Sequence, residues 1–82
     1  MIHVQYFARY RESLGLDSEQ LPWDTRFACL DDLRQVLLAR GGAWDVLAER
    51  NLMCARNDEL CSLAEPLQDG DQVAFFPTVT GG

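Results

Sequence analysis

Apolar and polar residues alternate at both ends of the chain, and this period of two predicts β-strands. The pattern covers residues 1–8 and residues 72–76. The residues expected to face the core are Ile2, Val4, Tyr6, Val73 and Phe75. Because successive side chains of a strand point to opposite faces, Phe7 and Phe76 are expected to point outward.

In residues 30–40 the apolar spacing changes to that of an α-helix. The expected stripe consists of Leu30, Leu33, Val36 and Leu37. Asp31 and Asp32 suit the amino end of a helix, although Cys29 occupies the position where a hydroxyl or carboxyl cap is usual. Gly41-Gly42 supplies the backbone freedom that ends helices, so we interpret this internal pair as a stop signal.

Weaker patterns predict five further short elements. They are a helical stretch over 9–16, a strand over 19–23, a short helix over 43–49, a strand over 52–56 and a returning strand over 60–63. This order predicts an α+β fold with a mixed sheet, in which the first and last strands are parallel neighbours at the centre. We therefore expect a ubiquitin-like β-grasp, with a domain over 1–77 and a flexible, extended tail over 78–82.

The tail has a composition suited to reaching into another protein. Pro77 has no N–H for a sheet ladder and therefore marks the end of the strand. Thr78, Val79 and Thr80 are β-branched and favour extended backbone, whereas Gly81 and Gly82 carry no Cβ. Five residues beyond Pro77 span roughly 17 Å when extended. A slender tail can present its carboxylate inside a partner's active site, although a frayed terminus has the same composition.

Composition narrows the possible functions. The chain has 82 residues and a net charge of −6, so one small domain with a protein partner of basic surface is expected, and nucleic acid is not. All seven basic residues are arginine, so no side-chain amine can receive the chain's own activated carboxyl group. Three cysteines at unrelated spacings predict neither a zinc site nor a disulfide framework. Without a signal peptide or a long apolar run, we expect a cytoplasmic location.

The stretch Asp69–Gly82, DGDQVAFFPTVTGG, is the most specific part of the sequence. Together with the opening MIHV and with Leu33-Arg34-Gln35 in the helix, it makes the whole chain resemble the small, sulfur-carrying subunits of molybdopterin synthase, the MoaD family. Two positions depart from the family. Thr78 stands where many members carry a second proline, and Cys29 replaces the usual hydroxyl cap.

The resemblance implies a reaction at Gly82. A ubiquitin-activating-like adenylyltransferase of the MoeB type adenylates this carboxylate with ATP and Mg²⁺. Sulfur from a persulfide donor then replaces AMP, and the resulting thiocarboxylate donates sulfur to cyclic pyranopterin monophosphate. Two such transfers build the dithiolene of molybdopterin, within a heterotetramer of two large (MoaE-type) and two small subunits. The family also places Phe7, Leu60 and Phe76 at an apolar docking surface for both partners.

By this interpretation the chain is a carrier that binds no cofactor or metal, while its partners supply the catalytic groups. Three alternatives stay open. The chain could carry sulfur for another pathway such as thiazole synthesis, be a β-grasp interaction module whose terminus is never activated, or modify lysines of other proteins.

Overall fold

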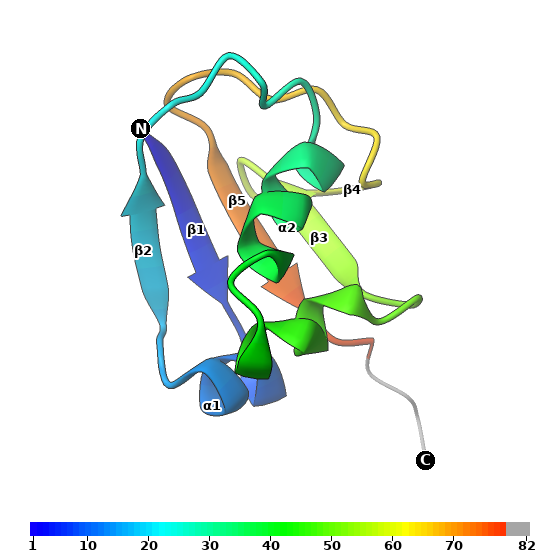
Figure 1. The fold of residues 1–82 in the computed structure, drawn as a ribbon. Coiled ribbons are helices and arrows are strands. Elements are labelled where there is room, and N and C mark those ends of the chain that lie inside the picture. Colours follow the sequence, from blue (N-terminus) through cyan, green and yellow to red (C-terminus); the bar gives the residue numbers. More distant parts are fainter. Residues whose placement is uncertain (79–82) are drawn as a thin grey trace.

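A computed structural model describes residues 1–78, and a mixed sheet of five strands forms its centre (Figure 1). The strands are β1 (Ile2–Tyr6), β2 (Ser18–Leu21), β3 (Met53–Arg56), β4 (Glu59–Cys61) and β5 (Gln72–Phe76). Their order across the sheet is β2-β1-β5-β3-β4. β1 and β5 run parallel at the centre and the other neighbours are antiparallel. The predicted α+β β-grasp arrangement is therefore confirmed.

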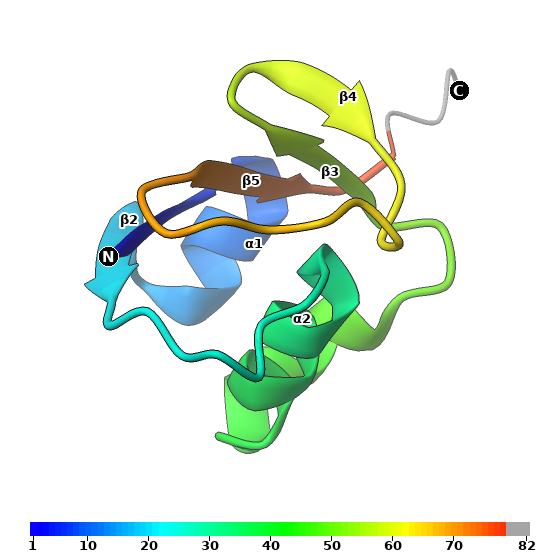
Figure 2. The ribbon, with the colours of Figure 1, turned by 90° about the horizontal axis from the view of Figure 1, so that it is seen from above.

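The helices are α1 (Ala8–Leu14), α2 (Leu30–Leu38) and η1, a 3₁₀ helix over Gly42–Ala48. Viewed from above, α2 lies against one face of the sheet, and no helix of residues 1–78 covers the opposite face (Figure 2). The side chains between α2 and the sheet form one apolar cluster. Its members include Ile2, Val4, Tyr6, Leu30, Leu33, Leu37, Leu47, Val73 and Phe75. All five core residues expected from the terminal strands are buried.

A carboxylate caps the amino end of α2. Oδ2 of Asp32 accepts the backbone N–H groups of Ala28 (2.9 Å) and of the N-cap residue Cys29 (3.1 Å), so it fixes the chain that enters the helix. The helix ends at Leu38, two residues before the prediction. Val36 was predicted to lie in the apolar stripe, but it is 41% exposed. The prediction was wrong there, because the buried residues of α2 are Leu30, Leu33 and Leu37.

Several strand boundaries differ from the prediction for local reasons. β1 ends at Tyr6, because Ala8 adopts a left-handed φ of 54° and begins α1. β2 covers 18–21 instead of 19–23, and Pro22, which follows it, lacks the N–H that a ladder needs. β4 begins at Glu59, since Asn57 and Asp58 form a two-residue turn with φ of 51° and 70°, which suits a tight hairpin.

A buried carboxylate joins this hairpin to the start of β5. Asp71, 6% exposed, accepts hydrogen bonds from Nε of Arg56 (2.7 Å), the Asn57 side-chain amide (3.1 Å) and the Gln68 N–H (2.8 Å). Burial by itself raises the pKa of Asp71, but these bonds together outweigh it and lower the pKa. The charged form of Asp71 therefore fixes the β3–β4 hairpin relative to the centre of the sheet.

Candidate functional site: an apolar groove beside the end of β5

The register of the sheet aligns small side chains across its uncovered face. Ala74 of β5 lies opposite Gln5 of β1 on one side and opposite Ala55 of β3 on the other. Ala55 in turn lies opposite Leu60 of β4. Side chains directly opposite one another point to the same face of a sheet, so these four residues form one row across four strands. Because the two middle residues are alanines, the row is hollow at its centre.

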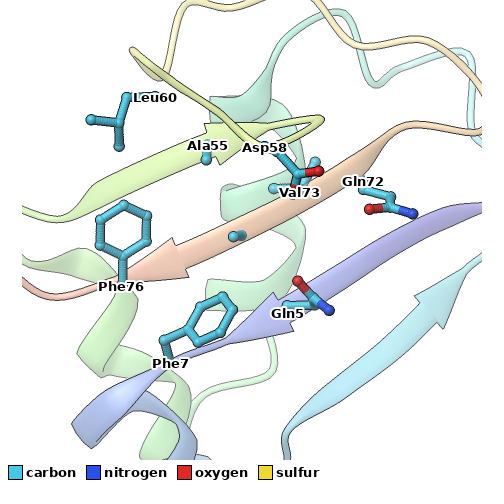
Figure 3. Close-up of a pocket in the computed structure, with 9 residues that line it drawn as sticks. Gln5, Phe7, Ala55, Asp58, Leu60, Gln72, Val73 and Phe76 are labelled. Carbon is cyan, nitrogen blue, oxygen red and sulfur yellow. The ribbon is translucent and has the colours of Figure 1, made fainter.

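Three larger apolar side chains surround this hollow. Phe7, Leu60 and Phe76 all line the same groove, as do both alanines (Figure 3). Leu60 is 68% exposed and Phe7 is 42% exposed, whereas Phe76 is half-buried. We define these three residues and the two alanines as the outer groove. The structure thus brings together the three residues that the family resemblance placed at a docking surface.

The parallel pairing of β1 with β5 explains where the rings of Phe7 and Phe76 lie. Phe7 follows β1 in extended conformation (φ −121°, ψ 157°), and its N–H donates to the carbonyl of Phe75 (3.2 Å). This bond continues the parallel pairing of β1 and β5 by one step. Since β1 and β5 are parallel, their carboxyl ends meet at the same edge, and both aromatic rings lie at that edge on the uncovered face.

The alanines were not identified from the sequence as site residues. In the sequence, Ala55 and Ala74 are only small residues within two predicted strands. A partial signal was present, because Ala74 alternates with the apolar Val73 and Phe75, and Ala55 is adjacent to the apolar Cys54. Recognising that they meet requires the pairing of β3 with β5, which the sequence alone does not specify.

Four further residues line the groove, namely Val73 and three polar residues. Gln5, Asp58 and Gln72 complete the rim. Within residues 1–78, no group of three or more His, Cys, Asp or Glu side chains is arranged to hold a metal ion. Among the same residues, no helix has the length and apolarity needed to cross a membrane. The arrangement can bind an apolar protein surface.

Two of the cysteines face each other on the covered side of the sheet. Cys54 and Cys61 are directly opposite in β3 and β4, and Sγ of Cys54 lies 3.3 Å from the Cys61 carbonyl oxygen. Burial raises the pKa of the Cys54 thiol to about 12 and also raises the pKa of Cys61. Both groups therefore remain thiols at neutral pH and are poor nucleophiles.

The chain leaves the sheet beside the outer groove. Pro77 is buried and Thr78 is exposed, with its hydroxyl donating a hydrogen bond to the backbone carbonyl of Asn51. The predicted site residues Val79, Thr80, Gly81 and Gly82 lie outside the described residues, so their role and the division into 1–77 and 78–82 remain predictions.

Comparison with known proteins assigns the family. The ThiS family model matches residues 4–82. The molybdopterin synthase sulfur carrier subunit of Escherichia coli (strain K12) is 43% identical, with all of both chains covered. A complex of subunits 1 and 2 of the molybdopterin-converting factor from Helicobacter pylori contains a similar chain (TM-score 0.67, 26% identity, 99% of this chain and 97% of that chain covered). Small archaeal modifier protein 1 of H. volcanii is also similar (TM-score 0.77, 25% identity, 95% and 97% covered). The chain therefore belongs to the ThiS family and, within it, to the molybdopterin synthase sulfur carrier subunits.

Proposed function

We propose that this chain carries sulfur as a thiocarboxylate on Gly82 and delivers it to cyclic pyranopterin monophosphate for molybdopterin synthesis. The observation that carries the proposal is the 43% identity to a sulfur carrier subunit over the full length of both chains. The outer groove supports it, because an apolar, aromatic-lined surface lies beside the point where the chain leaves the sheet. A carrier needs this combination of a docking surface and a slender arm.

The chemistry at Gly82 needs activation, because a carboxylate is a poor electrophile. Attack of a carboxylate oxygen on the α-phosphorus of ATP gives an acyl adenylate and pyrophosphate, with Mg²⁺ on the activating enzyme balancing the phosphate charge. Sulfur from a protein persulfide then attacks the acyl carbon, and AMP leaves with the former carboxylate oxygen. Cleavage of the S–S bond by a thiol leaves the thiocarboxylate. Neither Gly81 nor Gly82 has a side chain to obstruct these steps.

Both partners of the proposed cycle would use the outer groove in turn. A MoeB-type adenylyltransferase would engage it during activation, and a MoaE-type large subunit would engage it during sulfur delivery, in a heterotetramer. The similar H. pylori chain occurs in a complex with a second subunit, which supports the second of these contacts. ATP-dependent activation and free thiols suit a cytoplasmic location.

The test is the intact mass of the chain after coexpression with its MoeB-type adenylyltransferase and a persulfide-forming enzyme. We expect a gain equal to the difference between sulfur and oxygen, located on the peptide that ends at Gly82. A chain of unchanged mass would contradict the proposal and favour an interaction module. The control is the same chain coexpressed with an adenylyltransferase that lacks its ATP-binding residues.

A second function is supported by one observation, the similarity to small archaeal modifier protein 1. A modifier would form an amide between Gly82 and lysines of other proteins. The same preparation distinguishes the two, because adducts of higher mass on foreign proteins indicate a modifier. A thiocarboxylate that transfers sulfur to a thiazole precursor instead of the pterin would indicate the carrier of another pathway.

A further inference from the structure

Asn51 and Thr78 lie just beyond the paired ends of β3 and β5, at positions that would be opposite one another if the pairing were extended. In that antiparallel pairing Met53 lies opposite Phe76. Two more residues along each strand bring Asn51 opposite Thr78. Pro77 lies between Phe76 and Thr78 and has no N–H, but odd-numbered residues of β5 direct their backbone groups toward β1, as the bond from the Phe7 N–H to the Phe75 carbonyl shows. The missing donor therefore does not break the pairing with β3. At this next position the contact between the two segments is made by the Thr78 hydroxyl, which donates to the Asn51 carbonyl.

The loop that carries Asn51 is itself fixed to the body of the domain. Glu49 forms a two-pronged ion pair with Arg9 of α1, in which Nη2 of Arg9 lies 2.5 Å from Oε2 of Glu49. The N–H of Leu52 donates to the Glu49 carbonyl (3.3 Å), which closes the loop into a turn. The ion pair and the turn both act at Glu49, two residues before the Asn51 carbonyl that accepts the Thr78 hydroxyl. A bond to this carbonyl fixes Thr78 relative to the sheet.

From this geometry we propose that Thr78 is a positioning residue that fixes the point and direction at which the carrier arm begins. The proposal rests on the proposed function of Gly82. A threonine bonded to the domain leaves four residues, 79–82, to reach the partner's reacting centre. Fully extended, these four span roughly 13 Å, compared with roughly 17 Å for an arm that starts after Pro77. In the docked complex, the reacting centre should therefore lie within about 13 Å of Thr78.

Fixing Thr78 should raise the rate of sulfur delivery. An arm whose first residue is already ordered loses less conformational freedom when it enters a narrow active site. The benefit appears when the arm is inserted and its sulfur is placed against the pterin. Docking of the outer groove onto a partner does not require Thr78 to be ordered. Loss of the Thr78 hydroxyl should therefore lower the transfer rate and leave the affinity of the docked body nearly unchanged.

The first experiment measures backbone order in the isolated carrier by ¹⁵N relaxation. The Thr78 amide should have an order parameter near 0.8, close to that of the strands, and Thr78→Val should bring it below about 0.6. Valine keeps the branched shape and removes only the hydroxyl. Thr25→Val makes the same change in an exposed loop and should alter nothing at residue 78. A wild-type order parameter already below about 0.6 would overturn the proposal.

The second experiment measures single-turnover sulfur transfer from thiocarboxylated carrier to cyclic pyranopterin monophosphate on a saturating large subunit. Thr78→Val should slow transfer by about threefold to tenfold, the range expected for loss of one hydrogen bond. Its dissociation constant for the large subunit and its melting temperature should match those of Thr25→Val. Thr78→Ser keeps a hydroxyl and should restore most of the rate.

An unchanged transfer rate in Thr78→Val, or an equal loss in Thr78→Ser, would overturn the positioning role. If wild-type carrier never gains sulfur, the proposed function fails instead. The relaxation experiment needs no sulfur, so it still decides whether Thr78 is bound to the domain.

Discussion

Phe75 and Phe76 are neighbours in β5, yet the structure places them in opposite environments. Phe75 is completely buried among the core residues beneath α2, whereas Phe76 lines the outer groove on the uncovered face. The same division runs through β3, where Cys54 is buried and Ala55 lines the groove. The two faces of the sheet therefore have different roles. Its covered face stabilises the fold, and its uncovered face is available for partners.

Phe75→Ala should cause the largest effect on stability. Removing a fully buried phenylalanine loses its transfer free energy and leaves a cavity, so the free energy of unfolding should fall by about 3–5 kcal/mol. Urea denaturation followed by circular dichroism measures the loss. A change below about 1 kcal/mol would show that the covered face is not the tightly packed core.

Asp71→Asn should lower stability by about 1–3 kcal/mol at neutral pH, because the variant weakens hydrogen bonds to a nearly buried carboxylate. The wild-type pKa of Asp71 is lowered by folding, so its contribution is present above the unfolded value of about 3.9. That contribution is lost as the pH falls through this range toward the folded pKa.

Unfolding free energies measured at several pH values test this sign. The difference between wild type and Asp71→Asn should be large near pH 7 and should shrink as the pH falls below about 4. A difference that grows on acidification would contradict the lowered pKa. Because Asp71 lies at the start of β5 and also fixes the β3–β4 hairpin, this variant should affect docking only through the position of Leu60.

Phe76→Ala should reverse the pattern of Phe75→Ala. We expect about 2 kcal/mol less binding free energy for the large subunit, a loss of roughly thirtyfold in affinity, with a smaller change in stability. Isothermal titration calorimetry gives the affinity, and denaturation of the same sample gives the stability. A large loss of stability with intact affinity would place the ring in the core.

Leu60→Ala should have the smallest effect. Its side chain is mostly exposed in the free chain, so stability should change by less than about 0.5 kcal/mol. Affinity for the large subunit should fall by about fivefold, since the leucine forms one wall of the outer groove. Val36→Ala is the matched control, because Val36 is an exposed apolar residue on α2 away from the groove. Equal losses in both variants would mean that the groove is not the docking surface.

Much of the fold was predictable from local pattern. Alternation identified the faces of β1 and β5, because a period of two directly specifies which side chains share a face. It did not specify that Val36 is exposed, since the width of the helix contact depends on tertiary packing. The 3₁₀ geometry of η1 and the early end of β1 at the left-handed Ala8 also depend on how neighbouring elements pack.

The candidate site was only partly predictable. Outward positions for Phe7 and Phe76 followed from alternation, but the hollow at Ala55 and Ala74 depends on pairing between strands that are distant in sequence. The hydrogen bond from Thr78 to Asn51 depends on the same pairing. Sequence patterns therefore indicated which residues are exposed, and the sheet register determined which of them meet.

The central claim is that Gly82 supplies the reacting group. The most direct test deletes Gly82 alone and measures molybdopterin formation in a reaction reconstituted from the activating enzyme, sulfur donor, large subunit and precursor. We predict no dithiolene product from the shortened chain, with a melting temperature equal to that of the full-length chain. Product formed at the wild-type rate by the shortened chain would contradict the claim.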